Sequence, residues 1–134
     1  MANAVIGGMR FHHVALKCQD LSKSLAMYKA LGLCEIVRWG EGDGEIVMLD
    51  IGDGGRLELF ANGGDAFAPN GKWQHFAFGV DDVEHAYQTA LASGFLPKTA
   101  PKVVPLAARP QPMSIKVAFV IGPDGEEVEF FKEV

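Results

Sequence analysis

The 134-residue chain has few positive charges, and they are dispersed. Its 12 lysines and arginines are outnumbered by 17 aspartates and glutamates, so the net charge is −5. No cluster of basic residues is longer than an isolated pair. Nucleic-acid binding needs concentrated neutralisation of phosphates. The sequence therefore argues against a nucleic-acid partner.

Long apolar runs and cysteine frameworks are also missing. No stretch of 18 uncharged apolar residues occurs, so we expect no membrane span and no membrane partner. The first ten residues, MANAVIGGMR, lack the charged start and long apolar core of a signal peptide. The two cysteines, Cys18 and Cys34, lie in apolar, strand-like runs, where free thiols behave as small hydrophobes. These absences predict a cytoplasmic protein without disulfides.

What is present suits one soluble globular domain over residues 1–134. Hydrophobic residues make up 49% of the chain and charged residues 22%. About 100–150 residues is enough chain for a proper hydrophobic core.

The strongest pattern is an internal repeat. The segment HVALKCQDLSKSLAMYKALG begins at His13, and HFAFGVDDVEHAYQTALASG begins at His75, 62 residues later. The two segments align without a gap, with matching His, Ala, Asp, Ala and Gly. The chain is therefore predicted to contain two copies of one structural unit.

Each copy predicts a strand, a helix and three more strands. In the first copy, strands are expected at 11–18, 33–39, 45–51 and 56–62. Between the first two, Asp20 offers a helix cap and Gly32 a stop. The apolar helix positions are Leu21, Leu25, Tyr28 and Leu31.

The second copy repeats this order. A strand at 73–80 precedes a helix capped by Asp82 and ended by Gly94, and strands at 114–121 and 126–134 match the third and fourth strands of the first copy. The apolar helix face is Val83, Ala86, Tyr87, Ala90 and Leu91. We therefore predict an α+β fold of two tandem βαβββ modules, at about 11–62 and 73–134, joined by a linker at 63–72. The modules should form a pseudo-symmetric, curved mixed sheet with the helices on its outer face.

The segment 97–112 interrupts the repeat, because it holds five of the seven prolines. Proline lacks an amide donor, so we expect an irregular or edge segment. It is either a lid over a site or a plain surface loop.

Strand alternation places four polar residues on the face opposite the helices. The apolar residues Val14 and Leu16, like Phe76 and Phe78, should lie under the helices. The inward set then includes His13, Glu58, His75 and Glu129 at repeat-matched positions. A carboxylate in mid-strand is costly to bury unless it is paired or binds a metal. Two imidazoles and two carboxylates predict a divalent metal site.

These residues also carry a family resemblance over about residues 11–133. The motifs are HVALKCQD at His13, MYKALG at 27–32, LEL around Glu58, HFAF at His75 and PDG…VEF around Glu129. In this order the chain resembles the vicinal oxygen chelate superfamily, and within it glyoxalase I, the lactoylglutathione lyase.

The glyoxalase I resemblance implies the ligands and the reaction. It implies that His13, Glu58, His75 and Glu129 bind one Zn²⁺, Ni²⁺ or Co²⁺. It implies isomerisation of the hemithioacetal of a 2-oxoaldehyde and a thiol such as glutathione, through a metal-stabilised enediolate. Glu129 is then the expected catalytic base and Glu58 its opposite number.

The resemblance also suggests substrate contacts and assembly. Lys17 stands where glyoxalase I has an arginine that holds a glutathione carboxylate, and Asn62 where it has an asparagine. A surface lysine and a turn-forming asparagine are equally good explanations. Small bacterial-type members build the site across a homodimer, and closure within one chain is the alternative. His12 and His85 are expected to lie away from the site.

Other activities stay open. Acyl-CoA epimerases typically have Gln at the Glu58 position, whereas extradiol dioxygenases and fosfomycin-modifying thiol transferases use three ligands. Bleomycin-resistance proteins are a different class, because they share the fold and bind a drug without a metal. Glu58 counts modestly against the first three, and the full ligand set counts against the last.

Overall fold

The computed structural model describes residues 1–30, 32–69, 71–123 and 125–134, and its chain divides into two compact units. The first unit comprises residues 13–74 and 107–112. The second unit comprises residues 1–12, 75–106 and 113–134. Strand β1 (Arg10–Lys17) contributes its first three residues to the second unit and the rest to the first.

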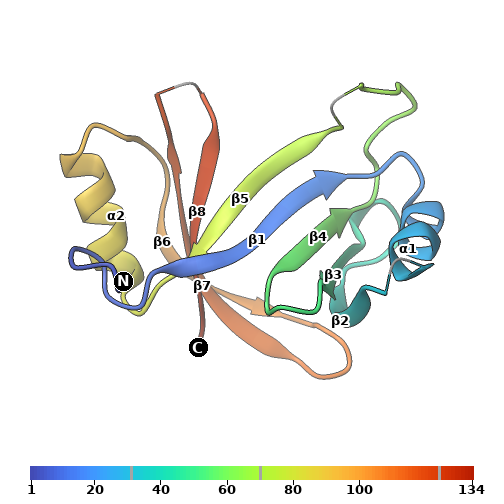
Figure 1. Ribbon diagram of the computed structural model, residues 1–134, viewed down its shortest axis with the longest axis horizontal. Helices are drawn as coiled ribbons and strands as arrows, with labels where there is room; N and C mark the ends of the chain where they lie inside the picture. The colour runs from blue at the N-terminus through green and yellow to red at the C-terminus, as the bar shows by residue number, and fades with distance from the viewer. Residues whose placement is uncertain (31, 70, 124) are drawn as a thin grey trace. The chain divides into compact units, whose positions relative to one another are not determined.

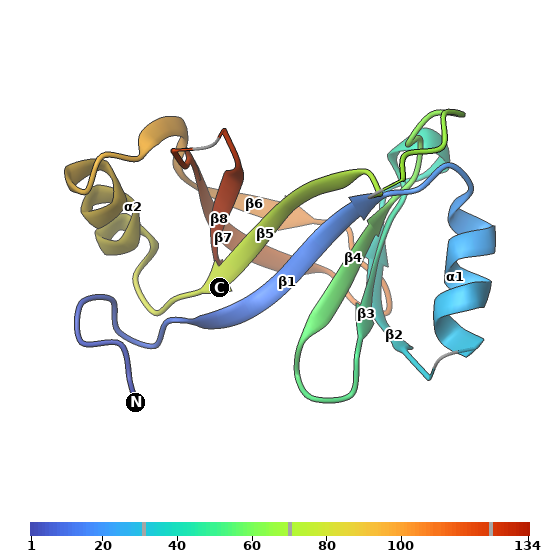
Figure 2. The ribbon, with the colours of Figure 1, turned by 45° about the horizontal axis from the view of Figure 1, so that its top comes forward.

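The first unit is a mixed sheet with one helix. Its strand order is β2-β3-β4-β1, and it contains β2 (Cys34–Trp39), β3 (Ile46–Asp50), β4 (Arg56–Phe60) and the short 3-10 turn Gly42–Gly44. Strands β2, β3 and β4 are antiparallel, whereas β1 runs parallel to β4. Helix α1 (Leu21–Ala30) connects β1 to β2 and lies along this sheet (Figures 1 and 2).

Helix α1 begins as predicted. The Asp20 carboxylate accepts the Lys23 backbone N–H at 3.0 Å, which satisfies one of the first amide groups of the helix. Gly32 follows the helix with φ 99°, the left-handed conformation that glycine adopts without strain. The predicted apolar position Leu31 lies outside the described residues.

The second unit repeats this topology with β5 (Trp73–Gly79), β6 (Leu96–Leu106), β7 (Met113–Ile121) and β8 (Glu127–Glu133). Its strand order is β5-β8-β7-β6, with β5 parallel to β8 and the other pairs antiparallel. Helix α2 (Val83–Ala92) is capped by Asp82, whose carboxylate accepts the His85 N–H at 3.0 Å. The predicted α+β fold of two βαβββ modules is confirmed.

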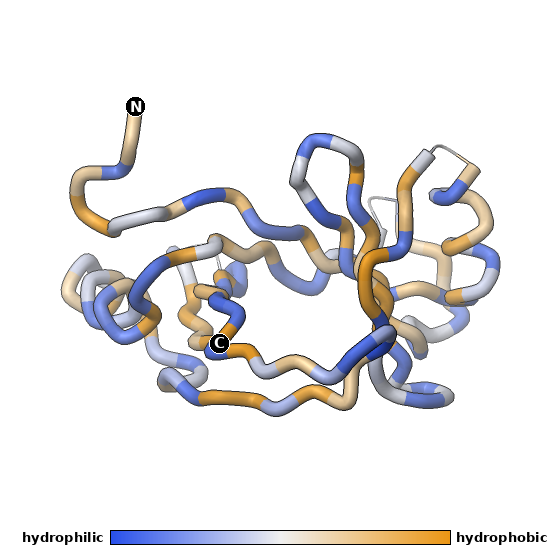
Figure 3. The backbone as a smooth tube through the Cα atoms, turned by 90° about the horizontal axis from the view of Figure 1, so that it is seen from below, coloured by the Kyte–Doolittle hydropathy of each residue, from blue (hydrophilic) through white to orange (hydrophobic). Residues whose placement is uncertain are grey.

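The predicted strand faces are confirmed by the cores. Under α1 lie Cys18, Val47, Leu49, Leu57 and Leu59, with Val14 and Leu16 beside them. Under α2 lie Val80, Ala118, Val120, Val128 and Phe130, with Phe76 and Phe78 beside them. Each helix combines hydrophobic and hydrophilic residues (Figure 3), as expected for a helix that packs one face against a sheet.

The proline-rich segment is an edge strand for most of its length. β6 pairs with β7 at the end of the sheet order, with register shifts between Pro97 and Lys102. The prediction of an edge segment is thus confirmed, because an edge strand tolerates missing amide donors. Residues 107–112 leave this strand and belong to the first unit, where the backbones of Arg38 and Arg109 exchange hydrogen bonds of 3.0 and 2.7 Å.

Two details differ from the predictions. Cys34 opens β2 and is exposed, whereas Cys18 is buried in the first core, and this burial raises the pKa of the Cys18 thiol. Strand β4 ends at Phe60, so strand alternation does not extend to Asn62, which has a left-handed φ of 63°.

Within the described residues, no helix has the length and apolar character needed to cross a membrane.

Candidate metal centre

The first unit carries a buried histidine–glutamate pair. His13 lies on β1 and Glu58 on β4, with Nε2 of His13 3.4 Å from Oε1 of Glu58. The two side chains are only 1% and 6% exposed. The parallel register sets Ala15, two residues beyond His13, opposite Glu58. The pair is therefore a diagonal contact between neighbouring strands on the face opposite α1.

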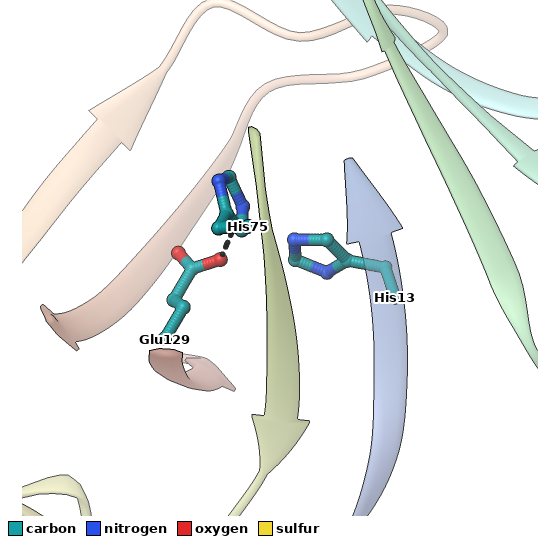
Figure 4. Close-up of side chains that lie close together, drawn as sticks. All are labelled: His13, His75 and Glu129. Carbon is teal, nitrogen blue, oxygen red and sulfur yellow. Dashed lines mark ion pairs between the residues drawn. The ribbon is translucent and has the colours of Figure 1, made fainter. Parts of the chain in front are cut away.

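The second unit carries the same pair. His75 lies on β5 and Glu129 on β8, with Nε2 of His75 3.1 Å from Oε1 of Glu129. Their side chains are 5% and 7% exposed. The register again sets the alanine two residues beyond the histidine, Ala77, opposite the glutamate. Figure 4 shows this ion pair, with His13 drawn from β1.

We call the sheet face that carries each pair the His–Glu face. Its geometry is duplicated in register, strand direction and residue type, although the two units differ in most other positions. A buried carboxylate loses its hydration, and this cost is offset only by a paired cation, hydrogen bonds or a metal ion. One buried histidine is often purely structural. Two buried His–Glu pairs at matched positions favour a shared chemical role.

The donor atoms fit a divalent metal ion. His13, His75 and Glu129 are buried and each offers one ligand atom, an imidazole nitrogen or a carboxylate oxygen. Glu58 adds a second buried carboxylate. Mixed imidazole and carboxylate ligands suit Zn²⁺, Ni²⁺ and Co²⁺ rather than the all-oxygen preference of Mg²⁺ or Ca²⁺. The residues present thus suit the metal that the sequence predicted.

The His–Glu face of the second unit is apolar around its pair. The ring of Phe119 lies edge-on to His75 at 5.4 Å between centroids. A buried cluster covers the rest of this face, with partly buried members at its margin: Ala77, Ile115, Val117 and Phe131, then Val104, Leu106, Met113 and Phe119. The alternation of Ile115, Val117 and Phe119 along one strand is the sequence signal that could have predicted this wall.

The His–Glu face of the first unit is more polar. Met48 stands opposite Glu58, and the next pair on the same face of these two strands is Asp50 with Arg56. Lys17 is the last residue of β1 and is exposed, and its backbone N–H donates to Lys72 O at 2.9 Å. The first unit therefore offers cationic side chains where the second offers hydrocarbon.

His12 does not follow the alternation predicted for it. It is buried, and its ring lies 4.1 Å from the ring of Phe131, which shares a side of β8 with Glu129. The reason is the ring contact with Phe131, a residue of the same unit, which holds the His12 imidazole against β8. His85 lies on α2 and donates to Val5 O at 3.0 Å, away from the pair in its unit as expected.

The comparison with known families is decisive at the level of the fold. Residues 10–130 match the family model described as the Glyoxalase/Bleomycin resistance protein/Dioxygenase superfamily. The chain belongs to this superfamily. The match covers both units and all four residues of the two His–Glu pairs. No curated protein matches the chain in sequence.

Solved structures agree with the superfamily fold. A hypothetical protein, BH1468, from Bacillus halodurans C-125 is 19% identical with a TM-score of 0.67, over 92% of this chain and 94% of that one. A methylmalonyl-CoA epimerase from Mycobacterium tuberculosis is 16% identical with a TM-score of 0.66, over 100% and 93%. A superfamily member from Vibrio splendidus 12B01 is 24% identical with a TM-score of 0.61, over 92% and 97%.

Proposed function

We propose that this protein is a metal-dependent isomerase of the glyoxalase I type, and that both His–Glu pairs bind one divalent ion. The observation that carries the proposal is the duplicated pair, His13 with Glu58 and His75 with Glu129, each buried and each in the same parallel register. A three-ligand enzyme of this superfamily would not need the second carboxylate. Glu58 is therefore the residue that favours this activity over the others.

Glu129 is the proposed general base. In the hemithioacetal, its carboxylate takes the proton from the carbon that carries the thioether and hydroxyl groups, which leaves an enediolate. The same carboxylate then returns the proton to the neighbouring former carbonyl carbon, and the hydroxyl proton moves to the former carbonyl oxygen, so that the thioester carbonyl forms. The product is a 2-hydroxy thioester, and no oxidant or reductant is required. The buried position of Glu129 beside apolar side chains keeps water from competing for the proton.

The other three residues of the two pairs, His13, Glu58 and His75, are proposed to bind the metal ion and so to orient the substrate. A bound divalent ion supplies Lewis-acid stabilisation of negative charge on the two adjacent oxygens of the substrate. His13 and His75 provide nitrogen ligands, each on a strand that runs parallel to the strand of its paired glutamate, and Glu58 provides the second carboxylate ligand. Core residues flank both glutamates along their strands, Leu57 and Leu59 for Glu58 and Val128 and Phe130 for Glu129, which holds these carboxylates in place.

The two His–Glu faces support a thiol adduct as the substrate. The apolar wall at Phe119 and Phe131 suits the organic substituent of a 2-oxoaldehyde. Lys17 and Arg56 suit the carboxylates of a thiol such as glutathione, with Asn62 as a further polar contact. Lysine keeps the charge of the arginine in glyoxalase I but not its two-pronged geometry, so we expect weaker binding of glutathione.

The proposal allows two arrangements of the metal centre. The ligands either come from one chain or, in a homodimer, His13 and Glu58 of one chain join His75 and Glu129 of its partner. Mixing a His13→Asn variant with a His75→Asn variant distinguishes them. Activity that returns on mixing supports a shared site, whereas activity that stays lost supports closure within one chain.

Metal content and activity test the function together. The purified protein is measured for metal by elemental analysis and assayed with methylglyoxal and glutathione after addition of Zn²⁺, Ni²⁺ or Co²⁺. We expect one ion per site and turnover of the hemithioacetal. Protein that takes up none of the three ions would overturn the metal centre and favour a drug-binding role. Metal uptake without turnover would overturn the glyoxalase activity alone.

A CoA-ester epimerase is the second candidate, because a methylmalonyl-CoA epimerase covers the whole chain with a TM-score of 0.66. The two activities share proton transfer beside a carbonyl. Incubation with methylmalonyl-CoA in deuterated water separates them, since an epimerase would exchange the proton next to the carbonyl. Exchange without methylglyoxal turnover would favour the epimerase.

A further inference from the structure

A second site of different character lies in the second unit, on the helix side of its sheet. It is a cavity of about 320 Å³, within the range of small-molecule sites. Strands β5 and β8 form its floor, α2 one wall and the N-terminal segment another. The residues that line it are Ile6, Met9, Phe76, Phe78, Thr89, Ala90, Ser93, Phe95, Glu126, Val128 and Phe130.

The cavity exists because α2 does not cover the whole helix side of the sheet. The helix packs mainly against β7, β6 and β8. Phe76 and Phe78 on β5 are consequently only partly buried, although they belong to the core face. Two phenylalanines that face this space leave apolar surface in water, and an apolar ligand would remove that surface from water.

The N-terminal segment is held in place as the second wall. The Asn3 side-chain carbonyl accepts the N–H groups of Val5 and Ile6 at 2.9 and 2.8 Å. His85 on α2 donates to Val5 O at 3.0 Å, and the Asp81 N–H donates to Gly7 O at 3.3 Å. The cavity is thus preformed by hydrogen-bonded backbone, so a ligand need not order this segment on binding.

The lining specifies the chemistry of the ligand. Four phenylalanines and Met9 dominate it, and the rings of Phe76 and Phe78 meet edge-to-face at 5.5 Å and 82°. Aromatic rings and the methionine sulfur favour a further flat ring. Among the described lining residues there is no basic side chain, so an anionic ligand such as a fatty acid would bury its charge in a mainly apolar site without a cation from the lining. We propose that this cavity is a binding site for a small neutral aromatic molecule of about two fused rings.

The position of this aromatic site links it to the metal-binding pair of the same unit. Phe76 follows His75 directly on β5, and Val128 and Phe130 flank Glu129 on β8. The same strands therefore present the aromatic site on one side and the His–Glu pair on the other. A bound ring would contact Phe76, which follows His75, and Val128 and Phe130, which flank Glu129.

The test uses indole as a neutral probe and indole-3-carboxylate as its anionic match, with the full-length protein. Titration by calorimetry and by ¹H–¹³C NMR of the methyl and aromatic signals should show saturable binding of indole. The carboxylate should bind at least about tenfold more weakly, because its charge would enter a mainly apolar site. The signals of Met9, Phe76 and Phe78 should shift with indole.

Thr89→Leu fills part of the cavity and should weaken indole binding at least about tenfold. Gln88→Leu is the matched control, because Gln88 is the adjacent, exposed helix residue outside the lining. It should bind indole like the unaltered protein. Because Thr89→Leu can disturb folding, xenon with the unaltered protein is the independent probe, since apolar cavities take up this gas. Indole should displace the bound xenon, which is measured by the return of the ¹²⁹Xe chemical shift toward its value in buffer.

Several results would overturn the proposal. Indole binding that does not saturate, equal affinity for the carboxylate, or unchanged binding by Thr89→Leu would each do so. So would a change in sedimentation of Thr89→Leu with no change for Gln88→Leu, because that result would assign the apolar surface to contact between copies of the chain. Metal uptake is read out separately and does not enter this test.

Discussion

The two units share their chemistry and differ in their packing. Both place a His–Glu pair in the same parallel register, with an alanine opposite each glutamate. Around this common geometry, α2 buries four residues, whereas α1 buries none among its described residues. The His–Glu face is more polar in the first unit than in the second.

This difference indicates which features the function needs. A duplicated structure is free to diverge wherever packing alone is at stake, because cores tolerate many hydrophobic combinations of suitable volume. The His–Glu register did not diverge. The divergence of the two faces is what would let one bind the polar end of a substrate and the other its apolar end.

The largest expected effect separates the roles of the two glutamates. Glu129→Gln should lower kcat by about 10²–10⁴-fold, the usual contribution of a general base. Glu58→Gln should lower metal content more than it lowers kcat at saturating metal. Steady-state kinetics with elemental analysis measures both, and Glu133→Gln, an exposed change on the same strand as Glu129, is the control. Equal loss of kcat in both variants would contradict the different roles proposed for the two glutamates.

The next effect concerns the anchoring of the two helices. Tyr87 on α2 is buried, whereas Tyr28 on α1 is only partly buried. Tyr87→Ala should lower the free energy of unfolding by about 3 kcal/mol, as for other buried aromatics, and Tyr28→Ala by roughly half of that. Urea denaturation of both variants measures this. A larger loss for Tyr28→Ala would contradict the difference in helix burial.

The helix caps should behave alike in both units. Asp20 and Asp82 each accept a backbone N–H three residues ahead at 3.0 Å. Asp20→Ala and Asp82→Ala should each cost about 1 kcal/mol of unfolding free energy. The same denaturation experiment applies, with Asp→Asn as the conservative control that retains a capping oxygen. If the alanine variant in one unit lost no unfolding free energy, packing rather than the cap would stabilise the start of that helix.

The smallest effect is an acid response confined to the first unit. The Arg38 guanidinium, helped by Lys29, lowers the pKa of Glu35 from 4.5 to about 2. A depressed folded-state pKa stabilises the protein above the unfolded pKa, and that stability is lost as the pH falls from about 4.5 toward 2. The pair is partly exposed, so the contribution is about 1 kcal/mol. Glu35→Gln should flatten the fall in unfolding free energy over this pH range, and an unchanged slope would contradict it.

Much of the fold follows from local physical chemistry. Period-two alternation assigned Val14 and Leu16 to one core and Phe76 and Phe78 to the other, because a strand must turn alternate residues to opposite faces. The caps Asp20 and Asp82 were equally predictable, since a capping bond spans only three residues. The matched positions of the two histidines and two glutamates came from the repeat. No tertiary information was needed for any of these.

The tertiary structure decided what depends on distant contacts. It set the end of β4 at Phe60, and so left Asn62 outside the strand that was predicted to reach residue 62. It placed His12 against Phe131 and joined 107–112 to the first unit through Arg38 and Arg109. It also left a cavity beside α2, because the position of a helix over a sheet depends on all the side chains between them. Sequence periodicity determines on which face of a strand or helix a residue lies, whereas the packing of many side chains determines which residues it contacts there.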